Sequence, residues 1–169
     1  MDNSFYSISE LNKLGFKKIG KDVLISRKAS IYSAHSISVG DHVRIDDFCI
    51  LSGTIVLNSY THISAYSALY AHNGIFTDDY SGLSPRTILF SASDDFSGEY
   101  LTNPMVPAEF TNVMGGPIFL KKYVQLGANT IVLPDLVIRE GAVTGAFSFV
   151  NKNLDEWMIF AGIPAKTIK

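Results

Sequence analysis

Cysteine is nearly absent from this chain: Cys49 is the single one among 169 residues, so no disulfide can close within it. This usage fits a reducing compartment, and Cys49 stands in an apolar run, where we expect a buried structural thiol rather than a nucleophile. No apolar run has the length of a membrane span, and residues 1–10 lack the layout of a signal peptide. We therefore expect a cytoplasmic protein that does not insert into a membrane.

Charge is also sparse. Charged residues make up 18% of the chain and the formal net charge is -2, with no basic stripe, so a nucleic-acid partner is not expected. The four histidines, His35, His42, His62 and His72, are widely spaced and no cysteine–histidine cluster joins them, so the pattern predicts no metal site. We expect the first three to be structural or surface residues. The length and the 47% apolar content predict one domain with a substantial core.

What the chain does have is a six-residue repeat of aliphatic side chains. From Val39 to Ile75 an aliphatic residue returns at every sixth position, and two further frames, over 19–31 and 120–150, keep the same period with one polar exception, Thr144. Such a period suits neither an amphipathic helix nor an alternating strand. It predicts a solenoid of short parallel strands, in which three hexapeptides close a triangular coil of about 18 residues. The repeated aliphatic residues should point inward and form the core.

Two segments depart from the repeat. Positions 7–16 read SISELNKLGF, and Ser7 followed three residues later by Glu10 is the pattern of a capping box. We predict a short helix here that covers the open end of the solenoid. The repeat also fails over 91–117, which predicts a loop extruded from one corner. The predicted layout is a single domain, 1–169, with an N-terminal cap at 1–18, coils at 19–90 and 118–150, the loop at 91–117 and a C-terminal tail at 151–169.

The C-terminal part reads GANTIVLPDLVIREGAVTGAFSFVNKNLDEWMIFAGIPAKTIK and contains the motif G-x-P-A-K at 162–166. With the repeat, it resembles the hexapeptide-repeat acyltransferases, in particular the galactoside, maltose and surface-polysaccharide acetyltransferases, over positions 19–169. The resemblance implies an all-β fold, a left-handed parallel β-helix, which is an exception to the right-handed crossover rule. It also implies a homotrimer with active sites between subunits, and acetyl-CoA as acyl donor.

Two Gly-Ala pairs, at 127–128 and 145–146, lie one coil apart and should stack on each other. Residues this small leave a strip of open backbone along which a narrow pantetheine arm can lie. The resemblance implies that coenzyme A lies on this strip and that three lysines contact it. The expected cofactor-binding residues are Gly127, Ala128, Gly145, Ala146, Lys152, Lys166 and Lys169.

In galactoside and maltose acetyltransferases the matching loop carries a Gly-His-Pro segment, whose histidine takes the proton from the sugar hydroxyl. Here positions 93–98 read Ser-Asp-Asp-Phe-Ser-Gly, and no histidine occurs from 73 to 169. One explanation is that Asp94 or Asp95 replaces the histidine, although the pKa of a carboxyl group is ordinarily about 4, which makes it a poor base at neutral pH. Another is that His72 is the base, because histidine titrates near neutrality and this position contacts the acceptor in the family. The third is an amine acceptor, which attacks a thioester with less help than a hydroxyl.

We favour the amine, because the missing histidine matters least to it. The predicted function is transfer of an acetyl group from acetyl-CoA to the amino group of a small-molecule, nucleotide-linked sugar in surface-polysaccharide biosynthesis. The alternatives are a sugar O-acetyltransferase acting through His72 and, in another class, a non-catalytic β-helix that serves as a binding scaffold. The catalytic candidates are His72, Asp94 and Asp95, and the acceptor-binding candidates are Glu99, Tyr100 and Asn103.

Overall fold

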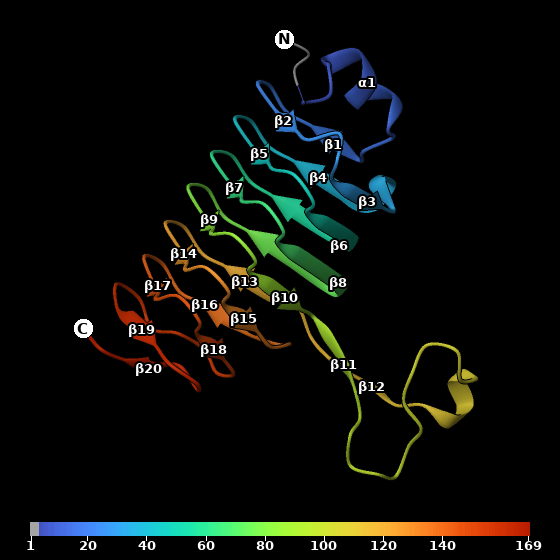
Figure 1. Cartoon of the computed structure of the whole chain (residues 1–169), viewed down its shortest axis with the longest axis vertical. Coiled ribbons are helices and arrows are strands. Elements are labelled where there is room, and N and C mark those ends of the chain that lie inside the picture. The colour runs from blue at the N-terminus through green and yellow to red at the C-terminus, as the bar shows by residue number, and fades with distance from the viewer. Residues whose placement is uncertain (1–3) are drawn as a thin grey trace.

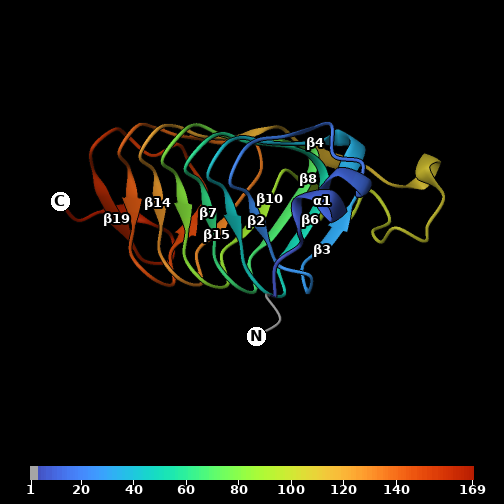
Figure 2. The ribbon, with the colours of Figure 1, turned by 90° about the horizontal axis from the view of Figure 1, so that it is seen from above.

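The chain winds into a triangular prism of short strands, and a computed structural model describes its residues 4–169 (Figure 1). Each coil contributes a strand to each of three faces, and each strand pairs in parallel with a strand of the next coil. Figure 2 shows the coils stacked side by side, with the N-terminal and C-terminal coils at opposite ends. The parallel β-helix that the six-residue period predicts is therefore confirmed.

The three faces are built from the following strands. Face 1 contains β1 (Lys18–Ile19), β4 (Ile37–Val39), the second parts of β6 (Ile50–Leu57) and β8 (Ala68–Thr77), β13 (Ile118–Leu120) and β16 (Val137–Ile138). Face 2 contains β2 (Leu24–Ile25), β5 (Arg44–Ile45), β7 (His62–Ile63), β9 (Gly82–Leu83), β14 (Gln125–Leu126), β17 (Val143–Thr144) and β19 (Ile159–Ala161), with β20 (Lys166–Thr167) antiparallel to β19. Face 3 contains β3 (Ser30–Tyr32), the first parts of β6 and β8, β10 (Ile88–Phe90), β15 (Ile131–Val132) and β18 (Phe149–Val150).

The core is a stack of inward-pointing residues, and the longer strands of face 1 contribute a second such residue, among them Ile37, Ile55, Ile75 and Ile118. Residues of this kind, each at most 3% exposed, are Val39, Leu57, Leu120 and Ile138 on face 1, Ile25, Ile45, Ile63, Leu83, Leu126 and Thr144 on face 2, and Leu51, Leu69, Leu89, Val132 and Val150 on face 3. These include most of the residues in the predicted frames. Burial of this continuous aliphatic column supplies the main driving force for folding.

The corner between faces 3 and 1 departs from the repeat on β8. Pairing of β6 with β8 is regular up to Ala71, but Ile75 then pairs with Ile55, so β8 carries two extra residues in a bulge. Thr77 instead of Ile75 therefore lies beside Leu57, and this coil is longer than the expected one. A bulge re-aims the side chains within it. The bulge leaves His72 and Asn73 exposed on the outside of the corner.

The N-terminal helix α1 (Ile8–Lys13) has the predicted capping box, in which the Ser7 hydroxyl accepts from the Glu10 amide and the Glu10 carboxylate accepts from the Ser7 amide. The carboxylate also accepts from the Arg27 guanidinium. Leu11 of this helix is 3% exposed and belongs to the core. The predicted cap over the first coil is thus confirmed.

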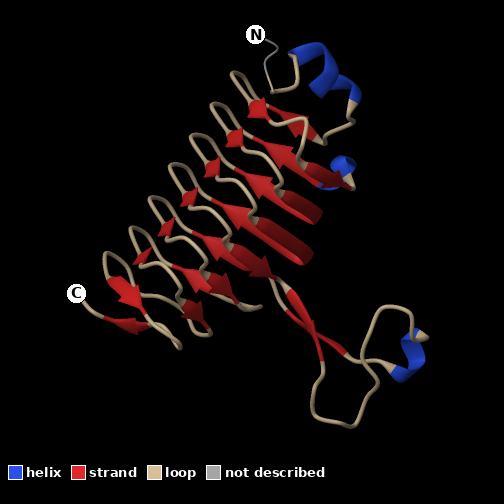
Figure 3. Cartoon of the chain, in the orientation of Figure 1, coloured by secondary structure: helices blue, strands red, loops and turns tan. Residues whose placement is uncertain are grey.

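The extruded loop begins and ends in a two-stranded antiparallel ribbon, formed by β11 (Ala92–Asp94) and β12 (Val113–Gly115). Beyond the ribbon lies a short 3-10 helix, η2 (Ala108–Phe110). Figures 1 and 2 both show this segment projecting from the prism, and Figure 3 shows that helix is otherwise confined to the N-terminal part, in α1 and η1 (Ala34–Ser36). Within residues 4–169, no helix is long and apolar enough to cross a membrane.

Candidate active site

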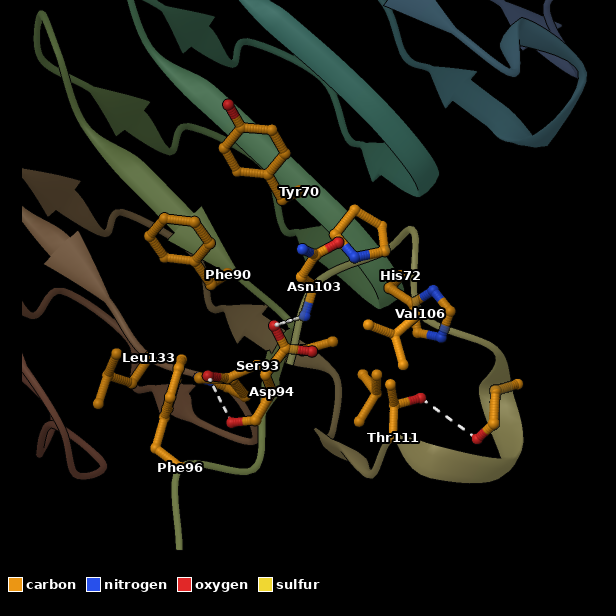
Figure 4. A pocket seen from close by; sticks show the side chains of 15 residues that line it. Tyr70, His72, Phe90, Ser93, Asp94, Phe96, Asn103, Val106, Thr111 and Leu133 are labelled. Carbon is orange, nitrogen blue, oxygen red and sulfur yellow. Dashed lines mark hydrogen bonds between the residues drawn. The ribbon is translucent and has the colours of Figure 1, made fainter. Parts of the chain in front are cut away.

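A cavity of about 880 Å³ lies where the extruded loop meets face 3, and we call it the acceptor cavity (Figure 4). One side is formed by the stacked rings of Tyr70 and Phe90, whose centroids are 5.3 Å apart. These two residues lie at matching positions of β8 and β10, so the repeat itself stacks them. The loop supplies the opposite side, and the cavity combines a mainly apolar wall with a few polar groups, which is typical of a small-molecule site.

Asp94 provides the carboxylate of this cavity. It ends strand β11, and one of its oxygens faces the backbone N–H of Asn103 at 3.4 Å, which is a weak hydrogen bond. The other oxygen has no hydrogen-bond partner in the described part of the chain, 4–169. Asn103 also lines the cavity, as expected of an acceptor-binding residue. Asp94 is therefore available to bind a cation or a hydrogen-bond donor.

His72 lies in the bulge of β8 and lines the same cavity, on the side of Val106 and Thr111 (Figure 4). Its side chain is exposed and makes no hydrogen bond or ion pair within residues 4–169. The structure thus brings His72 and Asp94, which are far apart in the sequence pattern, to one cavity.

Ser91 holds the bulge and the base of the loop together. Its buried hydroxyl accepts from the Asn73 N–H at 2.8 Å and donates to the Tyr70 carbonyl at 3.2 Å, and its carbonyl accepts from the Asn73 side chain at 3.0 Å and from the Gly116 N–H at 3.1 Å. One residue therefore fixes both the strand that carries His72 and the ribbon that carries Asp94. Sequence reasoning missed Ser91, because a serine where the repeat ends gives no signal of these contacts.

Asp95 has a different environment from Asp94. Its carboxylate accepts from the Ser97 N–H at 2.8 Å and from the Asn112 side chain at 2.8 Å, and it does not line the acceptor cavity. The hydrogen bonds from Ser97, followed by that from Asn112, lower the pKa of Asp95 below its ordinary value. These contacts support a role in holding the loop. Glu99 and Tyr100 are exposed on the loop and also lie outside the lining of the cavity.

The two Gly-Ala pairs stack as predicted, at the corner between faces 2 and 3. Gly127 donates its N–H to the Thr144 carbonyl at 3.0 Å, and a β-carbon on Gly127 would lie 2.6 Å from the Gly145 carbonyl carbon. Coil stacking alone therefore requires glycine at 127. The same corner continues into earlier coils, because the backbone N–H of Ser84 donates to the Leu126 carbonyl and the backbone N–H of Ser64 donates to the Leu83 carbonyl. We call this line, Ser64–Ser84–Gly127–Gly145, the donor corner.

Ala128 and Ala146 follow the two glycines, and the Phe147 N–H bonds to the Ala128 carbonyl at 2.8 Å. Lys152, Lys166 and Lys169 are all exposed, and none of them forms an ion pair with the described residues. Their ammonium groups are thus free to meet phosphate groups as point charges.

The donor corner and the acceptor cavity lie at opposite edges of face 3. The residues of the donor corner precede β15 and β18, whereas Leu133 and Pro134, which border the cavity, follow β15. A single chain therefore holds the two predicted half-sites apart. Within residues 4–169, no group of histidine, cysteine, aspartate and glutamate side chains is arranged to hold a metal ion.

No protein-family model matches the sequence. Among curated proteins, a dTDP-4-amino-4,6-dideoxy-D-glucose acyltransferase from Escherichia coli is 42% identical over 162 residues, which is 94% of this chain and 84% of the relative. The chain belongs to the hexapeptide-repeat sugar acyltransferases.

Solved structures of a relative in this acyltransferase family cover almost the whole chain. AntD, an N-acyltransferase from Bacillus cereus, matches with a TM-score of 0.97 and 52% identity over 99% of this chain and 89% of its own, in complex with dTDP and 3-hydroxybutyryl-CoA. Its S84C variant, in complex with dTDP-4-amino-4,6-dideoxyglucose and coenzyme A, matches with a TM-score of 0.97 and 50% identity over 100% of this chain and 91% of its own. Other AntD structures carry the substitutions D94A and D94N.

Proposed function

We propose that this acyltransferase moves an acyl group from acyl-CoA to the amino group of a dTDP-linked 4-amino-4,6-dideoxy sugar. The observation that carries the proposal is the Asp94 carboxylate in the acceptor cavity, on a loop without histidine. Asp94 and Ser84 also share residue type and number with the two positions substituted in the AntD structures. We also infer a cytoplasmic location, which is supported by the single cysteine, Cys49, since such usage fits a reducing compartment.

The reaction forms a C–N bond and breaks a C–S bond. An amine of this kind arrives largely protonated at neutral pH, because alkylammonium groups titrate at about 8 or above. It attacks the thioester carbonyl only after losing a proton, and coenzyme A leaves as the thiolate, which takes up a proton to become the thiol. Catalysis then rests mainly on holding the amine against the thioester.

Asp94 binds the sugar ammonium in this proposal, and His72 accepts the proton that the amine releases. The weak contact of Asp94 with Asn103, at 3.4 Å, leaves its charge available for a stronger partner. His72 has no protein partner within residues 4–169, so its imidazole is free to take a proton. Asp95 we assign to the architecture of the loop, because both its oxygens accept hydrogen bonds from it.

Coenzyme A lies along the donor corner, with its pantetheine arm over Ala128 and Ala146 and its phosphates near Lys152, Lys166 and Lys169. Because one chain holds the two half-sites apart, the complete site needs a neighbouring copy, and we infer a homotrimer. The loop supports this inference, since it exposes Phe96 by 78% and Met105 by 89%, an unusual exposure for large apolar side chains without a partner surface.

The test is the rate of thiol release from acyl-CoA with dTDP-4-amino-4,6-dideoxyglucose as acceptor. Replacing Asp94 by Asn removes the charge but keeps the size, and loss of one charge-assisted hydrogen bond should lower kcat/KM about 10- to 150-fold. Asp155→Asn is the matched control, because Asp155 is exposed in the tail and, among residues 4–169, pairs only with Arg139 at 3.2 Å. An Asp94→Asn enzyme as active as the control would contradict the role of Asp94.

One observation favours O-acylation as a second candidate. The His72 imidazole, which has no partner in the described residues 4–169, lies in the acceptor cavity, and a neutral imidazole can deprotonate a hydroxyl. This candidate predicts turnover with a hydroxyl-bearing dTDP-sugar and its loss in His72→Ala.

A further inference from the structure

The acceptor cavity lacks a counter-charge for the nucleotide part of its proposed ligand. Within residues 4–169 its lining contains no lysine and no arginine, and the full charge that it does contain is the negative one of Asp94. His72 begins the proposed reaction as a neutral imidazole. A dTDP-linked sugar carries a negatively charged diphosphate, which proteins ordinarily meet with arginine or lysine. One chain therefore offers a partner to the sugar amine but none to the diphosphate.

Arg86 is a cation whose charge no carboxylate meets. The other arginines are paired with carboxylates: Arg27 with Glu10, Arg44 with Asp46 and Arg139 with Asp155. The Arg86 side chain is exposed, and within residues 4–169 it forms neither an ion pair nor a hydrogen bond. Its guanidinium is thus available to an anion from outside the chain.

Arg86 lies beside the donor corner, two residues after Ser84. Its backbone N–H donates to the Ala65 carbonyl at 3.1 Å, and one coil further on the Asn129 N–H donates to the Pro85 carbonyl at 3.0 Å. The outer positions of successive coils therefore stack here in a row next to the donor corner. Arg86 is the member of this row that follows Ser84.

The guanidinium of Arg86 is held by an aromatic stack. Its central carbon lies 5.6 Å from the centroid of the Tyr66 ring, and that ring stacks on Phe48 at 4.9 Å. The backbone does not select arginine at this position, because a φ of 62° is in the left-handed region that favours glycine or asparagine. What the position gains from arginine is a charge held in place at the corner.

Coenzyme A has its own cations at the other end of the strip. Its phosphates are assigned to Lys152, Lys166 and Lys169 in the C-terminal part of the chain, whereas Arg86 precedes the coil of Gly127. With the phosphates at that end, the thioester lies at the opposite end, on the side of Arg86. The molecule that meets the thioester is the acceptor. Arg86 is therefore placed to contact the acceptor.

The acceptor that Arg86 meets belongs to a neighbouring copy. The donor corner and the acceptor cavity of one chain lie at opposite edges of face 3, so each complete site combines the corner of one copy with the cavity of the next. Within the cavity, Asp94 attracts the sugar ammonium and repels the diphosphate. The diphosphate should therefore lie away from Asp94 and toward the corner of the neighbouring copy.

We propose that Arg86 of one copy binds the diphosphate of the nucleotide sugar held in the acceptor cavity of the next copy. This inference rests on the proposed function and deepens it by naming a residue that recognises the nucleotide part of the acceptor. The two ends of the acceptor then meet opposite charges from two chains, Asp94 at the ammonium and Arg86 at the diphosphate. The planar guanidinium suits this ligand, because it can form two parallel hydrogen bonds with phosphate oxygens.

The first experiment measures, by calorimetry, the Kd of dTDP, of thymidine and of coenzyme A. Arg86→Met keeps the length of the side chain and removes its charge. We expect it to weaken dTDP binding about 10- to 150-fold and to leave thymidine and coenzyme A within about twofold of the native values. Arg86→Lys should recover only part of the loss, because an ammonium group cannot bind phosphate in the bidentate manner.

Lys122→Met is the matched control for Arg86→Met. The Lys122 ammonium lies over the rings of Tyr80 and Tyr123, at 5.6 and 5.2 Å from their centroids, and forms no ion pair within residues 4–169. It follows β13 and precedes β14, at the corner between faces 1 and 2, away from both half-sites. The same change of charge there should leave dTDP binding at the native value.

The second experiment tests which copy supplies Arg86. Arg86→Met and Asp94→Asn chains are co-expressed in equal amounts, so that about a quarter of the sites in mixed trimers join an intact Arg86 from one chain to an intact Asp94 from the next. We expect kcat/KM for the dTDP-amino sugar to rise above that of either variant alone. If both residues acted within one chain, no site in the mixture would hold both and the value would not rise.

Equal weakening of dTDP and thymidine by Arg86→Met, or a comparable loss of coenzyme A binding, would overturn the role of Arg86 and leave the proposed function intact. A mixture no more active than its parents would overturn the contact between copies. No turnover of the dTDP-amino sugar by the native enzyme would overturn the proposed function, whereas the binding of dTDP tests Arg86 without turnover.

Discussion

The hydroxyl of Ser91 gives the most informative stability prediction, because it joins the two elements that carry His72 and Asp94. Ser91→Ala removes a hydrogen bond from the Asn73 N–H at 2.8 Å and one to the Tyr70 carbonyl at 3.2 Å. The Tyr70 carbonyl keeps the Ser91 N–H at 3.0 Å as a donor, so the Asn73 N–H loses more.

The magnitude follows from these contacts. One net hydrogen bond contributes about 1 kcal/mol, and a donor left without a partner raises the cost, so we expect a loss of about 2 kcal/mol in the free energy of unfolding. For a chain of this size that corresponds to a fall in Tm of about 4–8 °C. The lost hydrogen bonds fix the bulge that carries His72 and the ribbon that carries Asp94. We therefore expect kcat/KM to fall by about tenfold or more, because the two side chains lose their fixed positions in the acceptor cavity.

Ser26→Ala is the control for this variant. The Ser26 hydroxyl is equally buried and makes a matching pair of contacts, donating to Asp47 and accepting from the Lys28 N–H at 3.1 Å, but it lies in the first coils, away from the acceptor cavity. Thermal unfolding by circular dichroism and steady-state kinetics measure both effects. A comparable fall in kcat/KM for Ser26→Ala, or an unchanged value for Ser91→Ala, would refute the assignment of Ser91 as a positioning residue.

Two further predictions concern single groups outside the site. The Arg27 guanidinium, followed by Ser7, lowers the pKa of Glu10 from 4.5 to about 2, so this carboxylate stabilises the native state above pH 4.5 and the contribution is lost as pH falls toward 2. Glu10→Gln should lower Tm at pH 7 and flatten the decline of Tm between those values; parallel profiles for the two proteins would contradict this. Burial raises the pKa of the Cys49 thiol to about 11, so a thiol reagent should leave the native protein unmodified at pH 8 and react fully in denaturant. Rapid reaction of the native protein would refute the buried position.

The repeating core could be predicted from the sequence, because the inward-pointing aliphatic residues recur at every sixth position. Leu51, Leu69 and Leu89 lie at one position of successive coils and are fully buried, as a six-residue frame requires up to Leu69. Ile75 is fully buried, as the frame requires, but Thr77 rather than Ile75 lies beside Leu57, because two residues inserted on β8 shift the register in a way that only strand pairing reveals.

The sites were predictable to different extents. The Gly-Ala pairs were found because two identical dipeptides one coil apart stack by repetition alone. Asp94 and Asp95 could not be told apart, since adjacent residues of one type diverge according to loop contacts with Ser97 and Asn112. His62 was expected to be a structural or surface residue, and its pairing with Asp46 joins two positions 16 apart that no periodic pattern connects.

The central claim is that the acceptor is an amine, and the bond formed in the product tests it most directly. The measurement incubates the native enzyme with acyl-CoA and dTDP-4-amino-4,6-dideoxyglucose, which carries both an amine and hydroxyls, and records the product mass before and after treatment with hydroxylamine. Hydroxylamine cleaves esters and spares amides. An added acyl mass that survives the treatment is the predicted result, whereas an added mass that the treatment removes would show O-acylation and contradict the account.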